Sequence, residues 1–297
     1  MDLHSLEALS VFDPLQSLAV FEKKCALPSC GLKKSATTSK LKKCSVCYST
    51  RYCCRDHQKE HWQVHKAFCR EIVAKQTSEK LSKMTDLFDD AMTMIVESNF
   101  DGFKELIERE LELVNWHNEE LDRATLLINI GACHHGSPVN LVRFARYLIK
   151  ECAADMNARN VNGATALMMA AMTGKECIVK ILLAEGNADV NAKDTTHGYT
   201  ALILAAGNGH EACVCALLAE GNADVNAKDT THGSTALILA ADNGHEACVR
   251  ALLAEGNADV NAKTTTDGCT ALKFALVCGH RNIAKLLIDK VKEQLHA

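Results

Sequence analysis

Eight cysteine and histidine residues between positions 25 and 69 form the densest group of potential metal ligands in this 297-residue chain. They occur as four pairs, Cys-x4-Cys, Cys-x2-Cys, Cys-x3-His and His-x3-Cys, and they are Cys25, Cys30, Cys44, Cys47, Cys53, His57, His65 and Cys69. Structural zinc is four-coordinate and accepts thiolate and imidazole ligands together. Eight ligands are enough for two structural zinc ions in tetrahedral sites.

A helix is expected over residues 56–69, with the sequence DHQKEHWQVHKAFC. Within it His57, His61, His65 and Cys69 recur every fourth residue, which places them along one face of a helix. Two further residues, Cys54 beside Cys53 and His61 within the helix, are alternative ligands.

The cluster resembles a MYND zinc finger. The residues that carry the resemblance are Cys-x-x-Cys at 44–47, Arg-Tyr-Cys at 51–53, His61-Trp62, His65-Lys66 and the closing Cys69. The resemblance implies a cross-brace, in which the first and third pairs bind one zinc ion and the second and fourth bind the other. One site would be Cys25, Cys30, Cys53 and His57, and the other Cys44, Cys47, His65 and Cys69.

The chain departs from the MYND pattern at three places. His57 stands where the family usually has cysteine, and imidazole is an acceptable zinc ligand. The first pair is wide, and 13 residues separate Cys30 from Cys44.

The MYND resemblance also implies a partner, because that family binds short proline-containing peptides, often of Pro-x-Leu-x-Pro type. The family's groove residues match Ser45, Gln58 and Trp62. Gln58 and Trp62 are four residues apart, so they would flank one groove on the helix, and an exposed tryptophan suits stacking on proline. The alternative is that Trp62 packs in the core of the finger.

The second half of the chain repeats itself with a period of 35 residues. GATALMMAAMTGKECIVKILLAEGNADVNA begins at Gly163, and related units begin at Gly198, Gly233 and Gly268. In each unit a threonine is expected to cap a short first helix. A glycine then ends that helix, and a second helix buries residues such as Cys213, Val214, Leu217 and Leu218.

These units resemble ankyrin repeats, which consist of a hairpin and two antiparallel helices. The Gly-x-Thr-Ala-Leu start, the Asn-Gly-His turn and the Ala-Asp-Val-Asn-Ala segment carry the resemblance over residues 160–297. Each unit is two residues longer than the usual 33, and Thr-Ala-Leu replaces the usual Thr-Pro-Leu-His. Residues 86–118 look like a helical N-terminal cap, as the end of a solenoid requires.

The repeat array is interpreted as a scaffold whose concave face and hairpin tips bind another protein. The recurring His210, His245 and His280 are assigned a structural hydrogen-bonding role, and the scattered single cysteines are assigned to core packing. The expected surface contacts are Lys193, Asp194, His197, Tyr199, His232 and Ser234.

Asn191, Asn226 and Asn261 recur in the Ala-Asp-Val-Asn segment of successive units. The resemblance to ankyrin proteins implies that such an asparagine can be hydroxylated. The alternative, which the residue type favours, is that its side chain stabilises a tight turn.

Charge is unevenly distributed along the chain. Residues 22–75 hold 13 Lys and Arg against 4 Asp and Glu, whereas the remaining residues hold 20 against 33. The basic segment, residues 22–75, offers an alternative function. The protein would be a nucleic-acid-associated regulator whose finger attracts phosphate groups. Because no aromatic residue lies among the lysines of the insert, nucleic acid is not the expected partner.

Neither a secretory signal nor a membrane-spanning run is recognised, so an intracellular protein of cytoplasm or nucleus is expected. The repeats leave no room for a catalytic SET domain of the kind that some MYND proteins carry. The finger also lacks the Cys-x-His-x2-Cys centre of a RING ubiquitin ligase. We therefore expect a non-enzymatic adaptor.

The predicted fold is mainly α, an ankyrin-repeat α-solenoid with a small N-terminal zinc-stabilised cross-brace finger. The expected order is an N-terminal segment (1–21), the finger (22–70), a connector (71–85), a helical cap or degenerate repeat (86–122), a diverged repeat (123–159), three repeats (160–194, 195–229 and 230–264) and a C-terminal repeat or cap (265–297).

Overall fold

The computed structural model describes residues 42–43, 51–52, 55–117, 122–134, 137–185, 187–255 and 257–296. The chain divides into two compact units, Met1–Ser82 and Lys83–Ala297. No helix in these described ranges is both long and apolar enough to cross a membrane.

The first unit contains a short β-ladder followed by a helix. Strand β1 (Lys42–Lys43) pairs antiparallel with β2 (Arg51–Tyr52), with Lys42 opposite Tyr52 and Lys43 opposite Arg51. Helix α1 (Arg55–Val96) begins in this unit and ends in the second. It contains the segment 56–69 that the sequence predicts to be helical.

The second unit is built from helices that follow the end of α1. Their bounds are α2 Phe100–Arg109, a 3-10 helix Leu111–Val114, α3 Leu126–Ala132, α4 Pro138–Lys150, α5 Ala166–Met172, α6 Glu176–Ala184, α7 Ala201–Gly207, α8 Glu211–Ala219, α9 Ala236–Asp242, α10 Glu246–Ala254, α11 Ala271–Val277 and α12 Arg281–His296.

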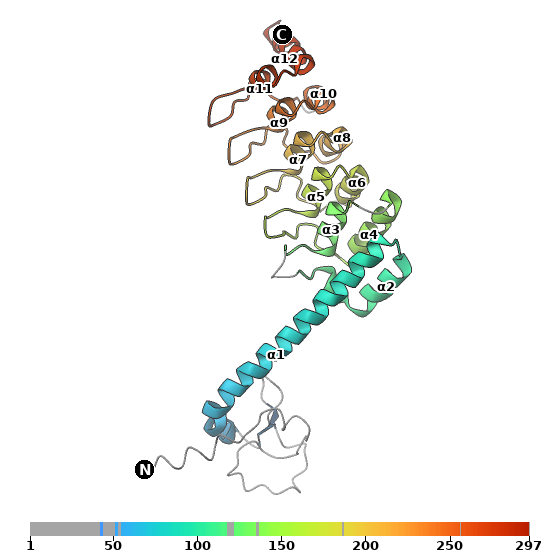
Figure 1. The fold of residues 1–297 in the computed structure, drawn as a ribbon, viewed down its shortest axis with the longest axis vertical. Helices are drawn as coiled ribbons and strands as arrows, with labels where there is room; N and C mark the ends of the chain where they lie inside the picture. Colours follow the sequence, from blue (N-terminus) through green and yellow to red (C-terminus); the bar gives the residue numbers. More distant parts are fainter. Residues whose placement is uncertain are drawn as a thin grey trace, which may run out of the picture. The chain divides into compact units, whose positions relative to one another are not determined.

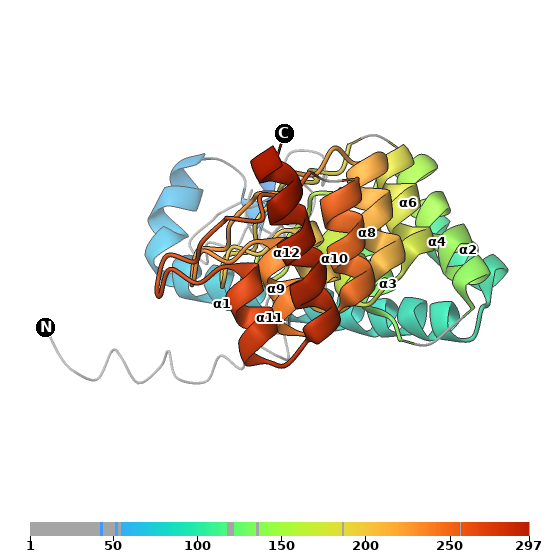
Figure 2. The same cartoon turned by 90° about the horizontal axis from the view of Figure 1, so that it is seen from above.

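The helices stack in two rows. An inner row of short helices runs from α3 through α5, α7 and α9 to α11, and an outer row runs from α4 through α6, α8 and α10 to α12 (Figure 1). The same two rows are seen along the stack in Figure 2. Extended loops join each outer helix to the next inner helix and project on the side of the inner row (Figure 1). This arrangement confirms the predicted ankyrin solenoid.

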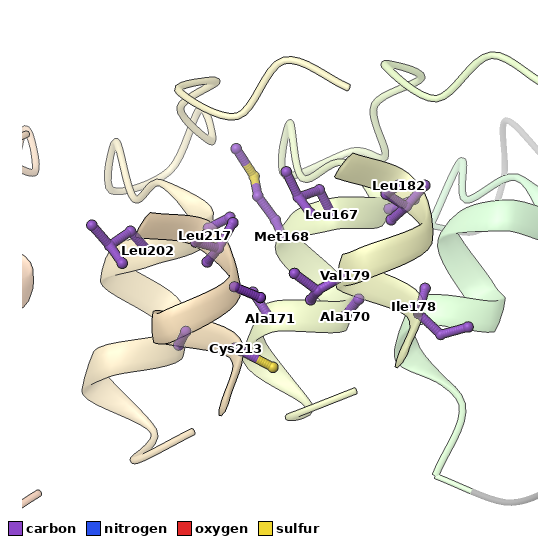
Figure 3. Packing of buried hydrophobic residues seen from close by; sticks show 14 of the residues in the cluster. Leu167, Met168, Ala170, Ala171, Ile178, Val179, Leu182, Leu202, Cys213 and Leu217 are labelled. Atoms are coloured by element: carbon purple, nitrogen blue, oxygen red, sulfur yellow. The ribbon is translucent and has the colours of Figure 1, made fainter. Parts of the chain in front are cut away.

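Local sequence explains where each inner helix begins and how closely it packs. The side chains of Thr165, Thr200 and Thr235 accept hydrogen bonds from the first-turn backbone N–H groups, as N-caps do. The helices that follow are rich in alanine, so neighbouring backbones approach closely. Between them, side chains from α5, α6, α7 and α8 interdigitate in one continuous core (Figure 3).

The core predicted from the repeat pattern is largely correct. Cys213, Val214 and Leu217 are fully buried on α8. Leu218, which the sequence predicts to be buried as well, is partly buried and packs against the same core.

Candidate functional site

The predicted zinc ligands fall into two groups in the structure. Residues 25, 30, 44, 47 and 53, and the proposed groove residue Ser45, lie outside the described residues. The backbones of His57, Gln58, Trp62, His65 and Cys69 lie on α1. Within the described part of the chain, no group of three or more His, Cys, Asp or Glu side chains is placed to hold a metal ion.

Helix α1 determines how the histidines on it are spaced. Because an α-helix rises 1.5 Å per residue, His65 and Cys69 are separated by about 6 Å along the axis. Residues four apart are neighbours on a helix surface, which suits two ligands of one metal ion. His57 precedes His65 by eight residues, or about 12 Å of rise, and so stands too far along the helix to share that ion.

In the array, the recurring histidine of each turn holds two repeats together. The Nε2 atoms of His210, His245 and His280 lie 3.0, 3.1 and 2.9 Å from backbone carbonyl oxygens of the preceding repeat. Since a carbonyl only accepts, Nε2 is the donor. The structural role predicted for these histidines is correct.

The asparagine of the Ala-Asp-Val-Asn segment also bridges repeats. The Oδ1 atoms of Asn157, Asn191 and Asn226 accept hydrogen bonds of 2.8 to 2.9 Å from the backbone N–H groups of Asp189, Asp224 and Asp259 in the following repeats. The asparagine side chain therefore stabilises the stacking of units, whereas within the turn an aspartate side chain accepts from the asparagine N–H, as Asp189 does from Asn191.

An aspartate, Asp194 or Asp229, organises the hairpin tip that precedes α7 or α9. Asp194 Oδ1 accepts hydrogen bonds from the backbone N–H groups of Thr196, His197 and Gly198. Burial opposes ionisation of Asp194, but these hydrogen bonds and one from the Thr196 hydroxyl outweigh it, so the pKa of the carboxyl lies below its usual value. The carboxylate is thus occupied within its own tip.

The structure places most of the predicted surface contacts at these tips. Lys193, His197 and His232 are exposed, and Asp194 and Tyr199 are partly exposed. The His197 ring stacks on Tyr199, with 5.1 Å between centroids and 16° between planes. Ser234 is an exception, since it is buried and its N–H donates to Asp229, so it offers no surface to a partner.

A row of basic side chains runs along the hairpins, and Lys193, one of the predicted surface contacts, belongs to it. Arg159 Nη1 donates to the carbonyl of Lys193 at 2.7 Å, Lys193 Nζ to that of Lys228 at 2.7 Å, and Lys228 Nζ to that of Lys263 at 2.9 Å. We call Arg159, Lys193, Lys228 and Lys263 the cationic ladder. Its signal in the sequence is a basic residue at the same position of four successive units.

The scattered cysteines are less uniform than predicted. Burial raises the pKa of Cys213 to about 12 and that of Cys248 to about 11, as expected for thiols packed in the core. Cys133, Cys152, Cys177 and Cys215 are only partly buried, and Cys278 is exposed. The assignment of every cysteine to core packing is therefore wrong for Cys278, which follows α11.

Comparison with protein families identifies both the repeats and the finger. A model of ankyrin repeats matches in three copies, over residues 92–194, 130–229 and 228–296, and the MYND finger model matches residues 25–69. No curated protein matches the chain. MYND fingers bind zinc, and both modules typically mediate protein–protein contacts rather than catalysis. The chain therefore belongs to the ankyrin repeat family and carries a MYND finger ahead of its repeats.

Proposed function

We propose that the protein is an adaptor with two separate recognition modules on one chain. The MYND finger reads short proline-containing motifs of Pro-x-Leu-x-Pro type, and the ankyrin array binds a second protein surface. The observation that carries the proposal is the match of both modules in a chain whose repeat histidines and core cysteines are engaged structurally. Neither match favours the nucleic-acid alternative.

The finger would hold two structural zinc ions. Cys25, Cys30, Cys53 and His57 would bind one, and Cys44, Cys47, His65 and Cys69 the other. Helix α1 supports this division, because His65 and Cys69 are one turn apart whereas His57 lies about two turns earlier. Bound zinc would supply most of the folding energy of so small a module.

The β-ladder supports the same division of ligands. Cys44 directly follows β1 and Cys53 directly follows β2. Since the strands are antiparallel, the chain leaves them at opposite ends of the ladder. Ligands at opposite ends suit two metal ions better than one.

The proposed peptide groove lies on α1. Gln58 and Trp62 stand four residues apart on this helix, so they are neighbours on its surface. A proline-rich ligand is preformed in an extended helix and docks on aromatic side chains at little entropic cost. Ser45 would add a polar contact from the Cys44–Cys47 segment.

The proposal is tested by titrating the zinc-loaded full chain with labelled Pro-x-Leu-x-Pro peptides. We expect micromolar binding that Trp62→Ala abolishes and that a scrambled peptide does not reproduce. Zinc content must stay at two ions per chain in the variant, which separates loss of the groove from loss of the finger. Equal binding of scrambled peptide, or full binding by Trp62→Ala, would exclude motif reading by this groove.

A further inference from the structure

The cationic ladder differs from the ion-paired basic side chains of the outer helices, because its charges have no acidic partner in the described part of the chain. On the outer helices Lys180 pairs with Glu176 and Arg250 with Glu246, each at 2.6 Å. Among the residues that the structure describes, the four ladder side chains form no ion pair, and all four are exposed. Their charges are therefore not neutralised by a neighbouring carboxylate.

Backbone hydrogen bonds fix the ladder in place while leaving donors free. Lys193 and Lys228 each donate one Nζ–H hydrogen bond to the backbone carbonyl of the next rung. An ammonium group has three donors and a guanidinium has five, so every rung keeps at least two. The acidic residues that follow two of the rungs in the sequence are Asp194 and Asp229. Each accepts hydrogen bonds from backbone N–H groups of its own tip.

The spacing of the rungs follows from the stacking of the repeats. The rungs recur once per repeat, and neighbouring packed helices lie about 8–10 Å apart. An extended polyproline-type peptide rises 3.1 Å per residue with three residues per turn, so every third side chain lies on one side at about 9 Å intervals. The spacing of the rungs therefore matches the spacing of every third side chain in such a peptide.

We infer that the cationic ladder is a docking site for an extended acidic peptide segment with a carboxylate at every third residue. This inference deepens the proposed function, on which it rests, by naming the chemistry of the partner that the array binds. Each carboxylate would accept hydrogen bonds from one rung, and the peptide backbone would run along the hairpins across the repeats.

The rest of the array disfavours a nucleic acid at the same place. Residues 195–264 hold three basic side chains and eight acidic ones, so the ladder belongs to a stretch of chain with net negative charge. A duplex carries one negative charge per about 1.7 Å of its axis, and the net charge of this stretch opposes its binding. A single extended peptide chain is narrow enough to follow the ladder.

The experiment titrates the zinc-loaded full chain with a labelled peptide of four Glu-Ala-Pro units, which lacks the Pro-x-Leu-x-Pro motif. Two control peptides have the same composition with the glutamates contiguous, or glutamine in place of glutamate. We expect the spaced peptide to bind more tightly than either control, and binding to weaken as salt screens the charges.

Substitutions in the ladder supply the matched controls. The double substitution Lys193→Gln/Lys228→Gln should weaken binding by roughly 2- to 30-fold, because each exposed charge pair contributes modestly. Lys193→Arg/Lys228→Arg should retain binding, as arginine already serves at Arg159. Lys180→Gln/Arg250→Gln removes the same charge from the outer helices and should leave affinity unchanged.

Three results would overturn the inference: equal affinity for the spaced and contiguous peptides, no effect of the ladder glutamines, or tighter binding of a single-stranded oligonucleotide than of the spaced peptide. A Pro-x-Leu-x-Pro titration of the same preparations runs in parallel. If that binding is intact while the acidic peptide fails, the ladder is wrong and the finger's function stands. If the acidic peptide binds while the Pro-x-Leu-x-Pro peptide does not, the ladder is supported and motif reading by the finger is wrong.

Discussion

A threonine precedes every inner helix of the array, and its hydroxyl accepts a hydrogen bond of 3.3 to 3.4 Å from a first-turn N–H group. A single residue type at a fixed place in the repeat thus sets where each helix starts.

In the last unit a different residue type takes over the role of the tip aspartate. Thr264 replaces the tip aspartate, and its hydroxyl accepts from the N–H of Cys269 as Asp229 accepts from that of Ser234.

Thr235→Ala removes one of these caps and should lower the free energy of unfolding by about 1 kcal/mol. Thr231→Ala in the same repeat is the matched control, since its exposed hydroxyl makes no hydrogen bond within the described residues. Urea titrations followed by circular dichroism compare the two. Equal losses would show that the hydroxyl of Thr235 does not act as a cap.

Asp267 should make the last repeat sensitive to acid. Its carboxylate accepts hydrogen bonds from the Cys269 thiol and the Thr264 hydroxyl, which lower its pKa to about 2. Because the folded pKa lies below the unfolded value near 3.9, this stabilisation is present above about pH 4 and disappears as pH falls to 2. Asp267→Asn should flatten the decline of unfolding free energy between pH 4 and 2, and an unchanged decline would refute the assignment.

At the scale of elements, the inner and outer helices could be predicted because their signals are local: a capping threonine, alanines on one face and a glycine at the end. Apart from the structural role of the recurring histidines, the bonds between repeats could not be predicted, because they depend on how one unit stacks on the next. The asparagine bridges, the cationic ladder and the burial of Ser234 all belong to this second class. The finger itself could be predicted because a metal site imposes its spacing on the sequence, and the MYND finger model matches residues 25–69.

The contact between a turn glycine and the next repeat's histidine is testable with two equivalent glycines. Gly209 and Gly279 have φ values of 80° and 78°. A Cβ at Gly209 would lie 2.6 Å from His245 Nδ1, whereas nothing lies within 4 Å of one at Gly279.

Gly279→Ala should therefore cost only the left-handed backbone penalty of about 1–2 kcal/mol. Gly209→Ala should cost about 1 kcal/mol more, because His245 must move and lose its hydrogen bond to the Gly207 carbonyl. Thermal and urea unfolding of both variants measure the difference. If the two losses are the same, the histidine does not hold the repeats together in the way described.

The proposed ligand set predicts which histidine substitutions remove zinc. His57→Ala and His65→Ala should each lower the zinc content from two ions per chain to one, because the proposal assigns the two residues, which lie about 12 Å apart along the helix, to different ions. His61→Ala, which lies between them on the same helix, should keep both ions. Metal analysis of the purified variants gives the count, and loss of zinc from His61→Ala would mean that the ligand set is misassigned.

At the scale of the whole molecule, the protein carries two interaction modules, for which we propose partners of different chemistry. The finger is rich in basic residues, cysteine and histidine, whereas the repeats are acidic overall apart from the cationic ladder. Two weak sites on one chain bind a partner carrying both motifs much more tightly than either motif alone, because the second contact becomes intramolecular. This two-site recognition is the central claim of the proposed function.

The most direct test is a calorimetric titration of the zinc-loaded chain with one peptide that joins a Pro-x-Leu-x-Pro motif to the spaced acidic segment, over a series of flexible linker lengths. Two-site recognition requires that the peptide with the best linker binds roughly 100-fold or more tighter than either motif alone. Trp62→Ala should abolish that gain, and Lys193→Gln/Lys228→Gln should lower it by the same factor of roughly 2 to 30 by which it weakens the acidic site. A joined peptide that binds no tighter than its better half at any linker length would contradict two-site recognition.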